Sequence, residues 1–164
     1  MHRWIGPPDE PRALVAYAWD SNEGLVYVTH DDPVDDGEDE VVRRAFANLE
    51  EEEAAHQVVE TDDSRVLVAT SAFAAEKVLL ERYMRTVHQA LDAPTVVVSV
   101  ARRGTLLACD VDAPERARTT LTQLHSESFV AAGENRITDR LVVVNDGVKQ
   151  DVITVNADGS VAGW

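Results

Sequence analysis

The densest group of chemically capable side chains in the sequence is a run of acids over residues 31–40. Seven of these ten residues are Asp or Glu, and Val34 is the only hydrophobic one. Carboxylates on a flexible loop are the ligands that Ca²⁺ and other hard cations prefer. The candidate metal ligands are Asp31, Asp32, Asp35 and Asp36. The run does not meet the EF-hand pattern, because with Gly37 at the turn position Val34 and Arg43 stand where ligands belong. A solvated acidic loop is therefore favoured over a metal site, since charge runs are usually solubilising.

The histidines, serines and cysteine match no known catalytic or metal-binding spacing. Five histidines are spread through the chain without an H-x-x-x-H or H-E-x-x-H pattern, and Cys109 is the single cysteine. Cys109 lies in an apolar run, where a buried and unreactive thiol is expected. No serine lies in a G-x-S-x-G turn, and no phosphate-binding glycine loop follows a strand. The sequence therefore predicts no cofactor and favours a non-catalytic protein over an enzyme.

Arginines at predicted turns form the second candidate site. Arg102 and Arg103 are an adjacent basic pair between two predicted strands of a strongly acidic chain. A guanidinium group presents a fork of donors that fits a carboxylate, so any ligand or partner site of this chain should be sought here first. The favoured interpretation is a polar hairpin tip that balances nearby acids through weak surface ion pairs. The candidate binding residues are Arg65, Arg102, Arg103, Asp110 and Arg140.

Composition restricts the class of partner. The 164 residues include 30 Asp and Glu against 15 Lys and Arg, for a formal net charge of −15 at pH 7. This charge repels phosphate backbones and anionic membrane surfaces, so neither nucleic acid nor a membrane is expected as a partner. No apolar run reaches the roughly eighteen residues of a membrane span, and no signal peptide is recognisable, so a cytoplasmic protein is expected. An acidic chain with few lysines fits both a salt-adapted proteome and a GC-rich genome.

The elements that must position these residues are predicted from apolar periodicity and turn signals. Apolar residues at helical spacing predict three helices, and β-branched runs joined by short polar turns predict four hairpins. The predicted helices are 40–55, 71–91 and 115–127. The predicted strand pairs are 13–20 with 25–30, 57–61 with 65–70, 95–101 with 105–110, and 141–144 with 148–155. Residues 1–12, which hold three prolines, are expected to be an extended or disordered lead-in.

Local signals predict where several of these elements begin and end. Ser71 is a candidate N-cap for the long helix, which the run from Asp92 to Pro94 would end. Gly104 suits the left-handed position of a three-residue hairpin turn. Asp112 and Glu115 form a D-x-x-E capping box for the next helix.

The order of elements predicts an α+β protein with one domain over residues 13–164. Strands joined by tight turns pair antiparallel, so we expect a mainly antiparallel sheet built from ββα units, with the helices packed on one face. The opposite face would then leave Trp, Tyr and Val surface in need of a partner. The leading hypothesis is a protein that binds another protein, or associates with itself, through a sheet edge or an open sheet face.

Two alternatives remain open at this point. The first is a metal-dependent enzyme of the hydrolase type that uses the acids of residues 31–39 or Asp110. The second is an immunity-type inhibitor whose acidic surface mimics nucleic acid and binds a basic toxin, which fits the net charge equally well.

Short patterns in the second half of the chain resemble a known family. Residues 100–110 read Val-x-x-Arg-x-x-Leu-Leu-x-x-Asp between two predicted helices, and residues 137–141 read Ile-Thr-Asp-Arg-Leu before an Asp146-Gly147 turn. These patterns are similar to the C-terminal part of an uncharacterised bacterial family, number 1444 in the domain-of-unknown-function series. That family commonly has an acid after the hairpin arginine, where this chain has Gly104. The family has no established activity, so the resemblance implies a fold and not a reaction.

Overall fold

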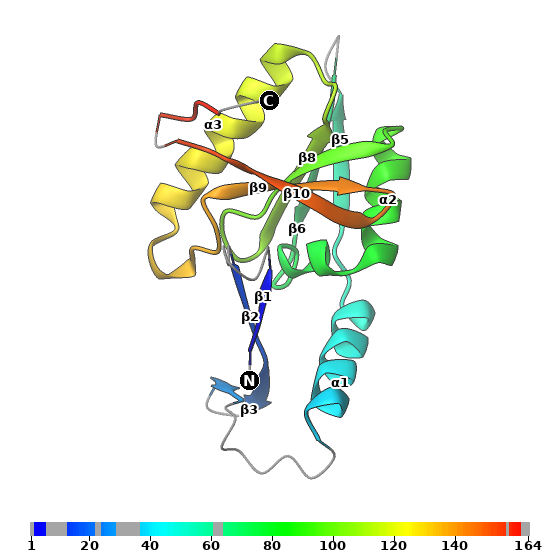
Figure 1. Cartoon of the computed structure of the whole chain (residues 1–164), viewed down its shortest axis with the longest axis vertical. Coiled ribbons are helices and arrows are strands. Elements are labelled where there is room, and N and C mark those ends of the chain that lie inside the picture. The colour runs from blue at the N-terminus through cyan, green and yellow to red at the C-terminus, as the bar shows by residue number, and fades with distance from the viewer. Residues whose placement is uncertain are drawn as a thin grey trace. The chain divides into compact units, whose positions relative to one another are not determined.

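The chain forms two compact units, Met1–Glu51 and Glu52–Trp164 (Figure 1). The computed structural model describes residues 2–5, 13–21, 24–28, 37–60, 64–156 and 158–161. The first unit has one apolar core, and the second has a core on each face of its sheet. Within the described ranges, no helix combines the length and the apolar character needed to cross a bilayer.

The first unit contains two short antiparallel strand pairs and one helix. Its elements are β1 (His2–Ile5), β2 (Ala13–Ala16), β3 (Ala18–Ser21), β4 (Gly24–Tyr27) and α1 (Glu38–Glu51). β1 pairs with β2 and β3 pairs with β4, so the predicted strand 13–20 is in fact two strands with different partners. Tyr17, Val28 and Val41 form the buried core. That residues 13–164 make one domain stays a prediction.

The second unit is built on a six-stranded antiparallel sheet. Its strands are β5 (His56–Glu60), β6 (Arg65–Thr70), β7 (Thr95–Ser99), β8 (Thr105–Asp110), β9 (Arg140–Asn145) and β10 (Val148–Thr154). The order across the sheet is β10-β9-β7-β8-β6-β5, and every neighbouring pair is antiparallel. The predicted α+β class and mainly antiparallel sheet are confirmed.

The helices of this unit lie on both faces of the sheet, so the prediction that they pack on one face is wrong. On one face α2 (Glu81–Leu91) packs with Val96 and Val98, and on the other α3 (Glu115–Ala131) packs with Val97. Figure 1 shows α2 and α3 on opposite sides of the strands. Consecutive strand residues point to opposite faces. Because β7 is apolar at consecutive positions, both of its faces must be covered.

The segment predicted as one helix over residues 71–91 is divided. A turn leads into the 3-10 helix η1 (Glu76–Leu79), and α2 begins only after Leu80, whose φ of −95° and ψ of 109° are extended. The Ser71 hydroxyl accepts a hydrogen bond from the Phe73 amide at 3.3 Å, which makes a local turn in place of the predicted helix cap. Asp92, in the left-handed conformation, ends α2 near the predicted place.

The predicted capping box before α3 is also absent from this described segment. The N-cap is Pro114, and no side chain caps the helix. The Asp112 amide instead donates to the Asp110 carboxylate at 3.0 Å, so these acids organise the end of β8 and not the helix start. The prediction for Gly104 is confirmed, because its φ is +77°.

The β9–β10 turn fixes the sheet against α2 through a glycine. Gly147 has a φ of +80°, and a Cβ at this position would lie 2.8 Å from the backbone oxygen of Glu81 at the start of α2. Gly133 has a φ of +57° with open space around it.

Replacing these two glycines separates backbone conformation from close packing. We expect Gly133→Ala to lower the free energy of unfolding by about 1 kcal/mol, the cost of a left-handed L-residue. Gly147→Ala should lower it by about 2 to 4 kcal/mol, because the new methyl group also meets Glu81. Urea denaturation of both variants measures the difference. Equal losses would mean that the turn does not approach α2 closely.

Candidate functional site

The hairpin tip between β7 and β8 is hydrogen-bonded to the segment that follows α3. The Arg103 amide donates to the Asn135 carbonyl and the Ile137 amide donates to the Ala101 carbonyl, both at 3.0 Å. These bonds hold the tip beside the 3-10 helix η2 (Gly133–Asn135). The predicted arginine pair is therefore held at a defined place on the surface.

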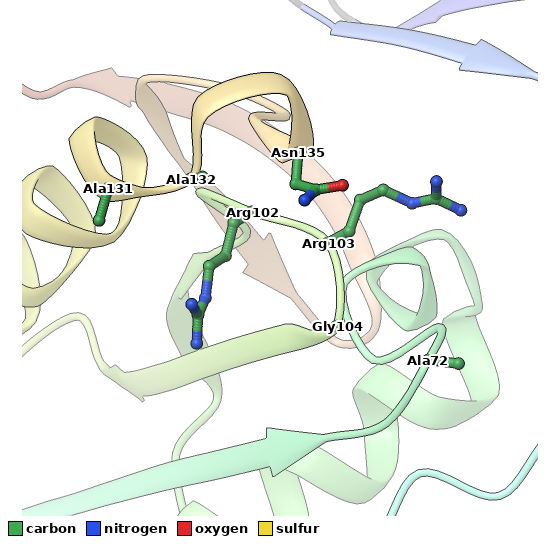
Figure 2. A pocket seen from close by; sticks show the side chains of 7 residues that line it. All are labelled: Ala72, Arg102, Arg103, Gly104, Ala131, Ala132 and Asn135. Carbon is green, nitrogen blue, oxygen red and sulfur yellow. The ribbon is translucent and has the colours of Figure 1, made fainter.

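A shallow depression of about 360 Å³ lies at this tip. It is lined by Ala72, Arg102, Arg103, Gly104, Ala131, Ala132 and Asn135. Figure 2 shows the guanidinium groups of Arg102 and Arg103 pointing in different directions. The Arg102 Nε donates to the Thr105 hydroxyl at 3.3 Å, and the Arg103 Nε lies 3.9 Å from the Glu76 carboxylate. Each arginine can bind a carboxylate by itself, but the two guanidinium groups do not point at one shared carboxylate site.

The surroundings of the depression are rich in acceptors. Ala131 and Ala132 come from the C-terminal end of α3, where the exposed carbonyls carry the negative end of the helix dipole. Burial raises the pKa of the Glu76 carboxyl, and the charge of Arg103 opposes part of this rise. Arg103 thus balances the charge of Glu76, and Arg102 bonds to Thr105 within the hairpin itself, which supports the hypothesis of a polar hairpin tip. A binding role for Arg102 and Arg103 stays a prediction.

The other predicted binding residues lie at two different ends of the sheet. Arg140 begins β9 next to Leu141, which pairs with Ser99 of β7. It therefore lies at the same end of the sheet as the hairpin tip. Arg65 begins β6 at the opposite end, where its neighbour Val66 pairs with Cys109, and Asp110 lies at that end too. The structure therefore groups Arg102 with Arg103 and separates both from Arg65 and Asp110.

The predicted metal ligands Asp31, Asp32, Asp35 and Asp36 lie outside the described residues. Among the residues that are described, no group of three or more His, Cys, Asp and Glu side chains could hold a metal ion.

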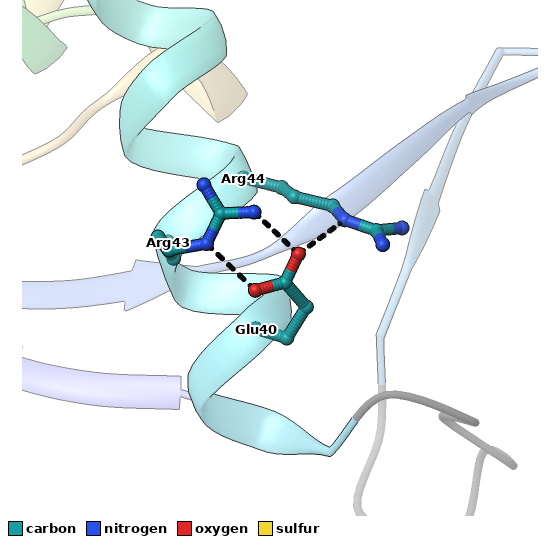
Figure 3. Close-up of polar contacts among 3 residues, drawn as sticks. All are labelled: Glu40, Arg43 and Arg44. Atoms are coloured by element: carbon teal, nitrogen blue, oxygen red, sulfur yellow. Dashed lines mark hydrogen bonds and ion pairs between the residues drawn. The ribbon is translucent and has the colours of Figure 1, made fainter.

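The last acids of the run over residues 31–40 lie in the first turn of α1, and one of them, Glu40, pairs with two arginines. The Glu40 carboxylate accepts hydrogen bonds from Arg43 Nε at 2.6 Å, Arg43 Nη2 at 2.5 Å and Arg44 Nε at 2.7 Å (Figure 3). These bonds, first to Arg43 and then to Arg44, lower the pKa of Glu40 to about 2. The carboxylate is therefore ionised and shared between two cations at neutral pH.

A buried Ser–His pair joins α3 to the sheet, and the sequence analysis did not find it. The Ser99 Oγ of β7 lies 2.9 Å from the Nδ1 of His125 on α3, and the two residues are only 3% and 1% exposed. Two signals could have revealed it. Ser99 is two residues from Val97 on the same face, and His125 continues the four-residue spacing of Ala117 and Leu121.

The pair has the distance of a nucleophile and its base, but its burial gives it a structural role. Burial lowers the pKa of His125, while the backbone and the charge of Asp139 oppose part of the shift. A catalytic serine must reach a substrate, and Ser99 is buried beneath α3. The nearby thiol of Cys109 is unreactive as well, since burial raises its pKa to about 12.

Comparisons of the chain with models of protein families, with curated proteins and with solved structures found no match. The resemblance of residues 100–110 and 137–141 to the uncharacterised bacterial family stays a prediction.

Removing the hydroxyl of the buried pair should destabilise the protein. Ser99→Ala leaves Nδ1 of His125 without this partner in an apolar environment, so we expect a loss of about 1 to 3 kcal/mol in the free energy of unfolding. The control Thr120→Ala, on the exposed face of α3, should stay within about 0.5 kcal/mol of the wild type. In Ser99→Ala/His125→Leu the loss should be smaller than the sum of the single losses. Additive losses would mean that the two residues do not interact.

The pH dependence of stability should report the neutral state of His125. The unfolded chain binds a proton on this side chain near its ordinary pKa of 6.5, whereas the folded protein resists protonation. The free energy of unfolding should therefore be complete above about pH 6.5 and fall as the pH is lowered from there. His125→Leu should lack this component of the slope in denaturation curves from pH 7.5 to 5. Identical slopes for both proteins would contradict the buried, neutral histidine.

Proposed function

We propose that this protein is a non-catalytic protein-binding module whose outer strand, β5, accepts an extended strand of a partner. The observation that carries the proposal is the direction of the backbone groups of β5. The Thr70 amide of β6 donates to the Ala55 carbonyl at 3.4 Å. Backbone groups of successive strand residues point alternately to the two sides of the strand. Gln57 and Val59 therefore bond to β6, while the N–H and C=O groups of His56, Val58 and Glu60 point outward.

A second hydrogen bond supports this assignment independently. The Ser71 amide donates to the Gly104 carbonyl at 3.3 Å, in continuation of the β6–β8 register. In β6 the backbone groups of odd-numbered residues, like those of Ser71, therefore bond toward β8. The backbone groups of even-numbered residues, like those of Thr70, bond toward β5. Both bonds give the same alternation. The hydrogen bonds between β6 and β8 therefore also indicate that His56, Val58 and Glu60 of β5 point away from β6.

The two edge strands of the sheet differ in how open they are. The register of β10 shifts between Lys149 and Asp151, so Gln150 is an extra residue that interrupts the edge. Such bulges are a common means of preventing strand addition. β5 pairs with β6 in one continuous register from His56 to Glu60. An added strand would meet regular backbone groups along β5.

Side chains hold β5 in place and leave apolar surface beside it. Lys77 donates to the backbone carbonyl of Glu52, just before the strand, and the His56 ring meets the Tyr83 ring edge to face at 6.3 Å. Val58 packs against the core under α2. Val59, on the other face, is 46% exposed. The strand is therefore fixed on its inner side, and a partner can gain both hydrogen bonds and apolar contact on its outer side.

Site-specific photocrosslinking tests the proposal without knowledge of the partner. A benzophenone amino acid replaces Val59 in one variant of the full chain and the exposed Thr120 of α3 in the control. After irradiation of the cells that express each variant, we expect a discrete covalent adduct from position 59 and none from position 120. Adding Val58→Pro, which removes an outward N–H, should abolish the adduct. An adduct that persists in Val58→Pro, or equal adducts from both positions, would contradict strand addition at β5.

A further inference from the structure

We infer that the partner strand is β5 of a second copy of this chain, paired antiparallel about Val58. The inference rests on the proposed function of β5 and names its partner. Two copies joined in this way would form one continuous antiparallel sheet with a two-fold axis beside Val58. An isologous contact of this kind uses the same surface on both copies.

The register follows from the outward backbone groups. Pairing about Val58 places Val58 opposite Val58 of the second copy and His56 opposite Glu60 at each end. Each of these three pairs consists of outward-facing residues, and such a pair exchanges two backbone hydrogen bonds. A shift by two residues, which is the smallest that keeps the outward groups facing one another, loses one of the three pairs. The symmetric register therefore gives the most hydrogen bonds that this strand can make with itself.

The same register places a hydrogen-bond donor opposite an acid at each end of the strand pair. The Glu60 carboxylate lies 3.1 Å from the Arg65 Nε of its own copy, and both side chains are well exposed. The His56 imidazole of the other copy would lie opposite this carboxylate, to which a ring N–H can donate a hydrogen bond. The pair occurs twice because of the symmetry. No pair of acids faces each other within the strand from His56 to Glu60 in this register.

The side of the sheet that carries α3 gains apolar contact in this arrangement. Gln57 and Val59 point to this side, beside the partly buried Val68 and Val66 of β6. In the register about Val58, Gln57 of one copy faces Val59 of the other. The exposed valine of each copy would therefore lie against a neighbouring strand and no longer against water. Five residues form a short interface, so we expect a reversible dimer that depends on protein concentration.

A charge exchange tests the register. Sedimentation equilibrium of the full chain compares the wild type with His56→Glu, which places Glu opposite Glu60 twice in each dimer. We expect the wild type to dimerise reversibly and His56→Glu to raise the dissociation constant about tenfold. The double variant His56→Glu/Glu60→His restores opposite partners in the same positions, so its dissociation constant should return to within about threefold of the wild type. A double variant as weak as His56→Glu would overturn the register.

A pair of proline variants tests the edge itself. Val58→Pro removes an outward donor from the central pair and should raise the dissociation constant by at least about tenfold. Gln150→Pro, at the interrupted edge of β10, should leave it unchanged. Circular dichroism confirms that each variant is folded. A wild-type chain that stays monomeric, or a dimer that neither His56→Glu nor Val58→Pro weakens, overturns the inference. The proposed function fails separately, if position 59 gives no adduct with any protein.

Discussion

The second unit depends on the burial of two central strands from both sides. Val96, Val97 and Val98 of β7 are each inaccessible to solvent, and β8 beside it is equally buried through most of its length. Backbone groups in such strands cannot bond to water, so the sheet has to continue on both sides until it reaches strands that can be exposed. β10 and β5 are these outer strands. The bulge in β10 interrupts one edge, while β5 stays regular.

The same double burial explains the polar groups inside the unit. A helix on each face requires that polar side chains between layers find partners. The Ser99 hydroxyl and Nδ1 of His125 satisfy each other between β7 and α3, and the buried Lys77 donates to the Glu52 carbonyl. These contacts fix the layers that support the outer strand. Ser99, His125 and the Cys109 thiol are all buried in these layers.

Much of the local structure could be predicted from the sequence, because turns are local. The pairing of β5 with β6, the left-handed Gly104 and the Asp146-Gly147 turn follow from residues that are close along the chain. The order of the strands depends on contacts between residues far apart in the sequence. The separation of Arg65 from Arg102 could therefore not be predicted from the sequence. The cover on both faces could have been expected, since TVVVS has no polar alternation. Leu124 of α3 is 41% exposed while the polar His125 is buried, so residue type alone does not identify the buried face of this helix.

The central claim is that alternate backbone groups of β5 are available to a second strand. Residue-resolved amide hydrogen exchange, measured at low and at high protein concentration, tests it most directly. Gln57 and Val59 should exchange slowly at both concentrations. His56, Val58 and Glu60 should exchange rapidly in dilute solution and slowly once the protein is concentrated. Equal protection of all five amides in dilute solution, or outward amides that stay unprotected at high concentration, would contradict it.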